Sequence, residues 1–317
     1  MKPVWILLFS LLFIFSCQKE KSEVVAAPPV AQDQGDKDNG CEKIKLSENY
    51  IESTDIIGGS RVLATDADSK STAMIIATEK NTGNSFVCTA TPITSRTLIT
   101  AAHCLDRAEK VTAVFYADVT CASGFKFSRD TIRAVDFKYH PDYNPNTMNS
   151  GNPDIGLVHL AADIKPGYPV YEINHTPETL HSELLLYGYG ITGSNNTDST
   201  VLRKVTLSRA EYGFELSSIV IENNGVRGIC LGDSGGPGLV RAGDKLQIAS
   251  VNSFGYGPRN DVCGGRSSLI LLHPFMPWIH ETLDKWGEIL LHEPQVPITP
   301  PAPTEPPVLS PAPPPIN

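Results

Sequence analysis

A glycine-rich turn at residues 232–237 contains the residue best suited to covalent chemistry. Its sequence is Gly-Asp-Ser-Gly-Gly-Pro, so Ser234 stands on backbone that can adopt positive φ and approach another molecule closely. A serine hydroxyl is a weak nucleophile at neutral pH, and it needs a nearby base together with a third group that orients the base. Gly/Ser turns without chemistry are common, so the turn alone leaves the function open.

Two upstream segments supply the missing groups. His103 ends an apolar run in Thr-Ala-Ala-His-Cys, and Asp154 begins another in Asp-Ile-Gly-Leu. The order along the chain is therefore base, acid, nucleophile. The turn also fits the G-x-S-x-G pattern of α/β-hydrolases, where the histidine follows the serine and the acid. That alternative leaves as bases only histidines in or beside the last helical stretch, so the order argues against it.

Four motifs in this order resemble those of the chymotrypsin/trypsin family of serine peptidases, and the resemblance covers roughly residues 56–292. They are Ile-Ile-Gly-Gly at 56–59, the motifs at 100–104 and 154–157, and the turn at 232–237. The resemblance implies an all-β fold of two antiparallel six-stranded β-barrels, with the active site in the cleft between them and a helix at the C-terminal end. It implies a serine endopeptidase.

The resemblance also assigns roles to individual residues. Ser234 is expected to be the nucleophile, His103 the general base and then acid, and Asp154 the carboxylate that orients His103. The backbone N–H groups of Gly232 and Ser234 are expected to form the oxyanion hole. In the family, a freed amino terminus pairs with the aspartate before the nucleophile, which here implies a pair between Ile56 and Asp233.

The activation site departs from the family pattern. The residue before Ile56 is Asp55, where trypsin-activated members have Lys or Arg. We therefore expect a zymogen that is cut between Asp55 and Ile56 by another kind of protease or by self-cleavage. Before the cut, the amine of Ile56 is not yet available to Asp233, and we expect the oxyanion turn to be misformed, because a buried charge pair that lacks one partner costs about 3–5 kcal/mol.

The specificity pocket is expected to include Gly228, Ser250 and Asn252. Gly228 lies six residues before the nucleophile, where trypsin-like members have an acidic residue, so cleavage after Lys or Arg is not expected. Ser250 matches a family serine that bonds the triad aspartate, with Val251 in place of a common aromatic residue and Asn252 in place of a glycine. We predict an uncharged P1 side chain in the substrate. In the alternative, Arg227 or Arg266 reaches the pocket and favours acidic P1 residues, including Asp55 itself.

Seven cysteines suit an exported protein with disulfides. Without Cys17 six remain, widely spread and with no C-x-x-C pair, which disfavours metal binding. The family resemblance implies the bonds Cys88–Cys104 and Cys230–Cys263. Cys41 and Cys121 are then left, and we expect them to pair. We expect no metal and no organic cofactor.

The first residues predict export. Residues 1–16 have one lysine and an apolar run of signal-peptide length, too short for a typical membrane span. Ile-Phe-Ser-Cys at 14–17 resembles a bacterial lipobox, which predicts lipidation of Cys17 and a place in the cell envelope, at the outer membrane, the periplasm or the cell surface. The alternative is an ordinary signal peptide cleaved nearby. The net charge of −9 gives no electrostatic footprint for nucleic acid.

The rest of the chain divides by composition. Residues 17–55 form a polar linker and propeptide, 56–292 the peptidase domain, and 293–317 a proline-rich tail of extended polyproline character. A helix is predicted at residues 277–291. Strands are predicted at 73–78, 85–91, 97–101, 110–117, 131–139, 155–160, 184–188, 202–207, 218–222, 238–240, 246–252 and 268–272.

The peptidase resemblance and the lipobox together predict the partners. They are a protein or peptide substrate, an activating protease, and a membrane held through the lipid on Cys17, with the protein itself a monomer. A competing hypothesis is a catalytically silent binding or adhesion module on the same fold. Such modules usually lack one of the three catalytic residues, and here all three are present.

Overall fold

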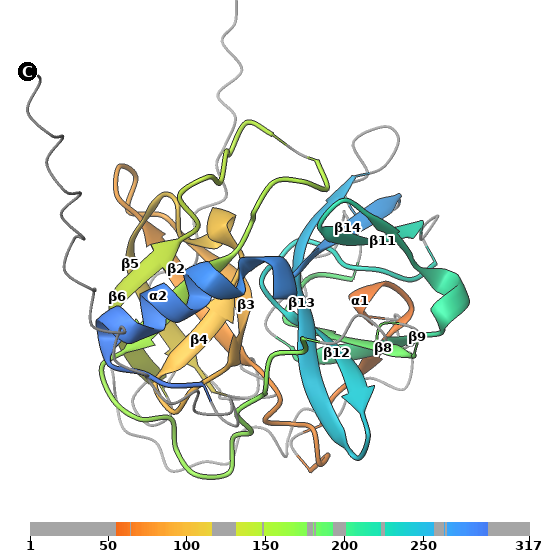
Figure 1. Ribbon diagram of the computed structural model, residues 1–317, viewed down its shortest axis with the longest axis horizontal. Helices are drawn as coiled ribbons and strands as arrows, with labels where there is room; N and C mark the ends of the chain where they lie inside the picture. Colours follow the sequence, from red (N-terminus) through yellow and green to blue (C-terminus); the bar gives the residue numbers. More distant parts are fainter. Residues whose placement is uncertain are drawn as a thin grey trace, which may run out of the picture. The chain divides into compact units, whose positions relative to one another are not determined.

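The computed structural model describes residues 55–63, 65–115, 131–147, 149–175, 180, 182–192, 201–222, 226–256, 263 and 265–290. In these residues the chain is mostly β-structure, with a short helix at the C-terminal end (Figure 1). The predicted signal peptide, the linker up to residue 54 and the tail at 293–317 lie outside the described residues. So do Cys17, Cys41 and Cys121.

Six antiparallel strands close into a barrel in the order β2-β3-β4-β7-β6-β5. Its interior is filled by small and branched apolar side chains, among them Ile75, Leu98 and Val158, which are fully buried. Closure pairs every strand on both sides, so the barrel has no open edge. The strands are β2 (Ala73–Glu79), β3 (Ser85–Pro92), β4 (Thr97–Thr100), β5 (Ala108–Val114), β6 (Thr131–Tyr139) and β7 (Gly156–Leu160).

An eight-stranded sheet follows, in the order β1-β9-β8-β12-β13-β14-β11-β10. The predicted fold class is confirmed, but in the described residues this unit is an eight-stranded sheet that ends at β1 and β10, and not the second closed six-stranded barrel that was expected. These two end strands have two and three residues, too few to leave a period in the sequence. The strands are β1 (Ser60–Arg61), β8 (Leu184–Gly188), β9 (Arg203–Leu207), β10 (Gly213–Glu215), β11 (Ser218–Glu222), β12 (Pro237–Ala242), β13 (Lys245–Tyr256) and β14 (Arg266–Leu271).

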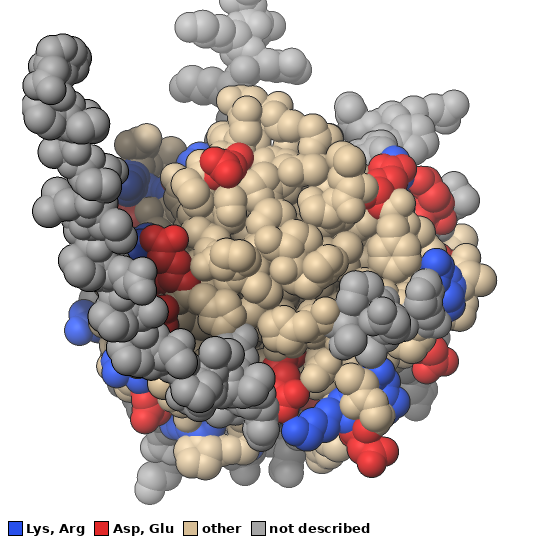
Figure 2. All heavy atoms as spheres, viewed as in Figure 1, with Lys and Arg blue, Asp and Glu red and all other residues tan. Residues whose placement is uncertain are grey.

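The C-terminal helix α2 (Met276–Trp286) connects the second sheet to the first barrel. It follows β14 through the short 3-10 turn η6 (His273–Phe275), and the indole N–H of Trp286 donates to Asp136 Oδ2 of β6 at 3.0 Å. The helix ends earlier than predicted because Gly287 adopts φ 71° and caps it. Figure 2 shows the face that carries α2, where acidic and basic side chains are interspersed around a largely uncharged middle.

Three short turns complete the described elements: η2 (Ala102–Cys104), η4 (Arg209–Glu211) and the four residues labelled α1 (Asp55–Gly58). The last is not a regular helix, since Ile56 has φ 37° and Ile57 has ψ 119°. Neither α1 nor α2 is long and apolar enough to cross a membrane.

Candidate active site

Strand pairing brings His103 and Asp154 together. β4 ends at Thr100, three residues before His103, and β7 begins at Gly156, two residues after Asp154. Thr100 and Gly156 are direct partners in the antiparallel pair of these strands, so the two loops that follow and precede them meet at one end of the barrel. The disulfide Cys88–Cys104 ties the η2 turn to β3, as predicted.

Asp154 holds His103 through two hydrogen bonds. The backbone N–H of His103 donates to Asp154 Oδ1 at 2.9 Å, and His103 Nδ1 lies 2.8 Å from Oδ2. A carboxylate can only accept, so the ring proton of a neutral His103 lies on Nδ1, and Nε2 keeps its lone pair. This is the tautomer that a general base needs.

Ser253 completes the surroundings of Asp154, a role that the family resemblance had implied for Ser250. The Ser253 hydroxyl donates to Asp154 Oδ2 at 2.5 Å, so the carboxylate accepts three hydrogen bonds although its residue is only 4% exposed. Burial by itself raises the pKa of Asp154. The charge of His103 and the hydrogen bonds from His103 and Ser253 outweigh burial and lower that pKa.

The charge of Asp154 has the opposite effect on His103. Burial disfavours the imidazolium, but the Coulombic attraction and hydrogen bond of Asp154 outweigh burial and raise the pKa of His103 above its usual value. Asp106, three residues along the chain, adds a smaller attraction. The ring is therefore built to accept a proton and to hold it next to a fixed negative charge.

Ser234 lies beside this pair on the turn that enters β12. Its hydroxyl donates to the backbone carbonyl of Ser253 at 3.4 Å, so Ser253 contacts both Asp154 and Ser234. Cys104 Sγ lies 3.9 Å from the Ser234 carbonyl oxygen, which places the turn against the residue that follows His103. Among the described residues, Ser234 makes no hydrogen bond to His103 Nε2. The hydrogen bond between a nucleophile and its base often tightens only when substrate binds.

Within the described residues, the backbone around Ser234 leaves two N–H groups free, as the predicted oxyanion hole requires. The carbonyls of Gly232 and Ser234 are both occupied, accepting from the Thr89 hydroxyl at 2.9 Å and the Thr89 N–H at 2.8 Å. Gly232 has φ 98°, a conformation that favours glycine. The N–H groups of Gly232 and Ser234 have no acceptor in the part of the chain that the structure describes. Two free donors therefore flank the Ser234 side chain.

Asp233 is fully buried beneath this turn. One carboxylate oxygen accepts the N–H of Gly190 at 2.8 Å, and the other accepts that of Cys230 at 2.9 Å. A Cβ on Gly190 would lie 2.5 Å from Asp233 Cγ, so a side chain there would displace the carboxylate. The Ile56 side chain is also fully buried, in the apolar core of the second sheet. The predicted pair between the Ile56 amine and Asp233 stays a prediction, because that nitrogen is part of a peptide bond in the intact chain. The misformed turn expected before the cut is not what the structure shows: in the intact chain the turn is formed, with the Asp233 carboxylate accepting two backbone N–H groups.

The structure corrects the placement of two predicted pocket residues. Ser250 and Asn252 point from β13 into the interior and are fully buried: the Ser250 hydroxyl faces Gly238, and the Asn252 amide lies under the Ser234 turn. The family pattern of serine, aromatic residue and glycine fits Ser253-Phe254-Gly255, three residues later. A register shift in the pairing of β13 with β14 between Asn252 and Phe254 turns Ser253 towards Asp154.

Gly228, the third predicted pocket residue, lies where the chain approaches the nucleophile turn. It is buried, its N–H donates to the Ile57 carbonyl at 3.0 Å, and Cys230 two residues later forms the predicted disulfide with Cys263. Gly228 adds no charge to this region. Its role at the base of a substrate pocket stays a prediction.

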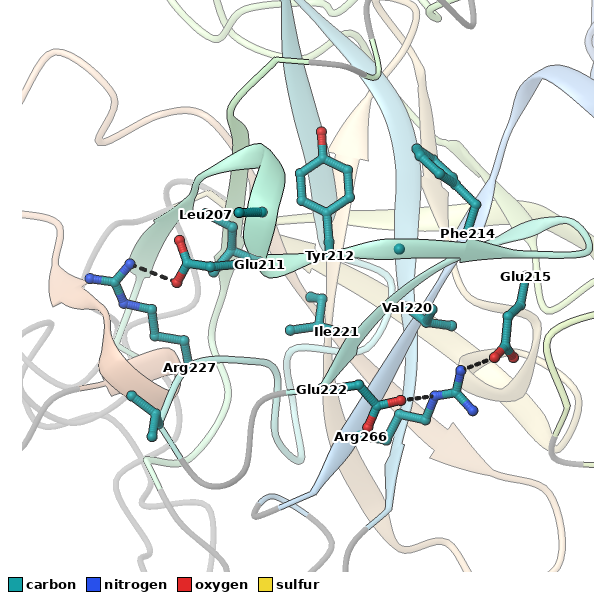
Figure 3. Close-up of a pocket in the computed structure, with 13 residues that line it drawn as sticks. Leu207, Glu211, Tyr212, Phe214, Glu215, Val220, Ile221, Glu222, Arg227 and Arg266 are labelled. Carbon is teal, nitrogen blue, oxygen red and sulfur yellow. Dashed lines mark hydrogen bonds and ion pairs between the residues drawn. The ribbon is translucent and has the colours of Figure 1, made fainter.

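Arg227 and Arg266 do not supply a free positive charge. Figure 3 shows both at a groove of about 700 Å³ beside β10 and β11. Arg227 pairs with Glu211 at 3.0 Å, and Arg266 pairs with Glu222 at 2.9 Å and also with Glu215 (Figure 3). His103, Asp154 and Ser234 do not line this groove. The two arginines are therefore compensated by carboxylates, which weakens the alternative of an acidic P1 preference.

The most metal-like cluster among the described residues is His103 with Cys88 and Cys104. Both sulfurs belong to one disulfide, so neither is the thiolate that a metal would require. The cluster is better explained by the close packing of the disulfide against His103.

Comparison with known proteins agrees with this geometry. The sequence model of the family described as Trypsin matches residues 56–279. The chain is 29% identical over 217 residues to a venom serine protease of Polistes dominula, covering 61% of this chain and 74% of that protein. It is 28% identical over 232 residues to phenoloxidase-activating enzyme 1 of Spodoptera litura, covering 65% and 61%.

A solved structure shows the same fold. The structure titled HL collagenase, at 1.7 Å resolution, aligns with a TM-score of 0.57 and 20% identity, covering 72% of this chain and 98% of that one. The family match extends over most of the described residues and over more than half of the chain. The chain belongs to the trypsin family of serine proteases. Membership at this level supports a peptidase function.

Proposed function

We propose that the chain is a serine endopeptidase in which Ser234, His103 and Asp154 act together. As Ser234 Oγ bonds to the carbonyl carbon of the scissile peptide, His103 Nε2 takes the hydroxyl proton and the carbonyl oxygen becomes an oxyanion. His103 then gives this proton to the leaving amine as the C–N bond breaks, which leaves an acyl-enzyme. A water molecule then attacks the acyl carbon while His103 takes its proton. His103 returns this proton to Ser234 Oγ as the ester bond breaks, which releases the acid product.

The observation that carries this proposal is the bond between His103 Nδ1 and Asp154 at 2.8 Å. This bond supports the tautomer in which Nε2 is free to accept a proton. The contacts of Ser253 with both Asp154 and the Ser234 hydroxyl support Ser234 as the nucleophile. The unoccupied N–H groups of Gly232 and Ser234 add support, since one such donor typically contributes about 10²–10³ in rate.

Activation by a cut between Asp55 and Ile56 is the second part of the proposal. Ile56 is a β-branched residue with φ 37°, a backbone conformation that costs about 1–3 kcal/mol in such residues. Cutting the peptide bond before it removes this constraint and creates an amine beside the buried Ile56 side chain. Asp233 is the buried carboxylate expected to pair with that amine. The activator is then another protease that accepts Asp at P1. Self-cleavage would require the acidic P1 preference that the pairing of Arg227 and Arg266 with carboxylates weakens.

For substrate choice we propose a protein or peptide with an uncharged P1 residue. Gly228 brings no carboxylate, and the nearby guanidinium groups of Arg227 and Arg266 are already paired. A P1-scanning peptide library on the cut protein tests this preference, and a dominant choice of Lys, Arg, Asp or Glu would contradict it.

We further propose an exported monomer anchored to the cell envelope through a lipid on Cys17. Two disulfides in the described residues suit an oxidising compartment. A bond between Cys41 and Cys121 would keep the body attached to the anchor after the cut at Asp55. N-terminal sequencing and non-reducing mass spectrometry of protein isolated from cells test both points. A free thiol on Cys121 would contradict the tether.

A fluorophosphonate probe tests the peptidase function itself. The cut protein should form a covalent adduct on the tryptic peptide that contains Ser234, and Ser234→Ala should not. If cut, folded protein forms no adduct, the competing hypothesis of a silent binding module holds.

A further inference from the structure

The side chain of Asn252 is a buried polar group directly beneath the nucleophile turn. The residue is fully buried, and its amide Nδ2 donates to the Asp233 carbonyl at 3.1 Å and to the Tyr187 carbonyl at 3.3 Å. Its Oδ1 has no hydrogen-bond partner among the described residues, so the two bonds of Nδ2 offset only part of the cost of burying the amide, and an apolar side chain would avoid that cost. The bonds that the amide makes therefore indicate its purpose.

The bond to Asp233 acts on the peptide group that carries one oxyanion donor. The Asp233 carbonyl and the Ser234 N–H belong to the same planar peptide unit, so fixing the oxygen also fixes the direction of the N–H. A hydrogen bond at the oxygen also polarises the unit and makes the N–H a stronger donor. The same carbonyl accepts the Gly236 N–H at 2.9 Å, so two donors hold this oxygen.

The backbone of Asn252 holds the same turn from the other side. Its carbonyl accepts the Gly235 N–H at 2.7 Å, and its N–H donates to the Gly236 carbonyl at 2.7 Å. A Cβ on Gly236 would lie 2.8 Å from Asn252 Nδ2, so the glycine leaves the space that the amide occupies. The bond to Tyr187 anchors the amide to β8, a strand in the middle of the second sheet.

We propose that Asn252 is a positioning residue that aims the Ser234 N–H at the developing oxyanion. This inference rests on the proposed peptidase function. Asn252 does not touch substrate, because it is fully buried. Its effect passes through the peptide unit between Asp233 and Ser234. It therefore favours the transition state, where charge gathers on the oxygen, more than the bound ground state.

The test compares Asn252→Val and Asn252→Asp with Ser250→Ala, each in the cut protein. Valine removes the donor, and aspartate replaces the NH₂ group by an acceptor that repels the Asp233 carbonyl. Ser250 lies on the same strand and is buried, but its hydroxyl has no hydrogen-bond partner among the described residues. We expect Asn252→Val to lower kcat about 10- to 100-fold, less than loss of the donor itself. KM should stay within about twofold, since ground-state binding is unchanged.

Inhibitor affinity separates positioning from a general loss of structure. A peptide boronic acid forms a tetrahedral adduct with an oxygen in the oxyanion hole, whereas a product peptide does not. Asn252→Val should weaken the binding of the boronic acid by the same factor as it lowers kcat. The affinity for the product peptide should be unchanged. An unchanged kcat, an equal loss with Ser250→Ala, or equal weakening of both inhibitors would overturn the role.

A second measurement does not depend on catalysis. In uncut protein labelled with ¹⁵N-serine, the Ser234 amide signal is identified by its absence in Ser234→Ala. Asn252→Val should shift that signal, whereas Ser250→Ala should leave it in place. An unmoved signal would overturn the role of Asn252 even in a silent protein. Failure of the fluorophosphonate adduct in the unaltered protein, by contrast, counts against the peptidase function.

Discussion

Replacing Ser253 with alanine removes one of the three hydrogen bonds that Asp154 accepts. The bond is 2.5 Å long, and Asp154 and Ser253 are 4% and 2% exposed, so water does not readily replace the lost donor. A hydrogen bond to a charged group contributes about 1.5–3 kcal/mol. We expect the free energy of unfolding at neutral pH to fall by that amount.

The same substitution has a predicted direction in the pH profile. A carboxylate with one donor fewer attracts the His103 imidazolium more strongly, so the pKa of His103 rises further and the acid limb of kcat/KM moves to higher pH. The assay is kcat/KM against pH for the cut protein, with urea unfolding of the same samples. Ser250→Ala is the matched control. The reasoning would be refuted if Ser253→Ala and Ser250→Ala had the same acid-limb midpoint and the same free energy of unfolding.

Three further predictions follow from the site. Asp154 raises the pKa of His103 above its usual value of 6.5, so the acid limb of kcat/KM in the unaltered protein should have its midpoint above pH 6.5. A midpoint below pH 6.5 would contradict the pairing of His103 with Asp154. Replacing Cys88 and Cys104 together with alanine opens a loop of 16 residues and should lower the free energy of unfolding by about 3 kcal/mol in urea, whereas an unchanged midpoint would refute this. Asp55→Arg should let trypsin produce a protein that reacts with the fluorophosphonate probe, while trypsin-treated unaltered protein stays unreactive; equal labelling of both would contradict activation at this bond.

The sequence predicted the parts of the site that short motifs encode. His103 and Asp154 lie beside the ends of β4 and β7, which pair directly with each other. Ser234 precedes β12 in the other sheet, and hydrogen bonds to Thr89 and Ser253 hold it beside the pair. The bonds Cys88–Cys104 and Cys230–Cys263 followed from the family resemblance. The strands of the first barrel were predictable as short β-rich runs between turn residues, whereas their closure into a barrel followed only from the family resemblance.

Ser253 was missed because its direction depends on pairing rather than on local pattern. Alternation along a regular strand puts residues 250, 252 and 254 on one face. The register shift between Asn252 and Phe254 breaks that alternation, and it is set by how β13 pairs with β14. The signal that was available is the glycine at 255, which completes the family pattern. Starting the pattern at Ser250 put Val251 in the position of the aromatic residue and Asn252 in the position of the glycine.

Combining His103→Ala with Ser234→Ala measures most directly whether the two residues act as one unit. The assay is single-turnover hydrolysis of a peptide by cut protein, with unfolding midpoints to confirm that each variant is folded. We predict that each single change lowers kcat on the order of 10⁶-fold and that the double change lowers it no further, because either one disables the same proton transfer. Losses that multiply in the double variant, or a His103→Ala protein that keeps its kcat, would contradict the account.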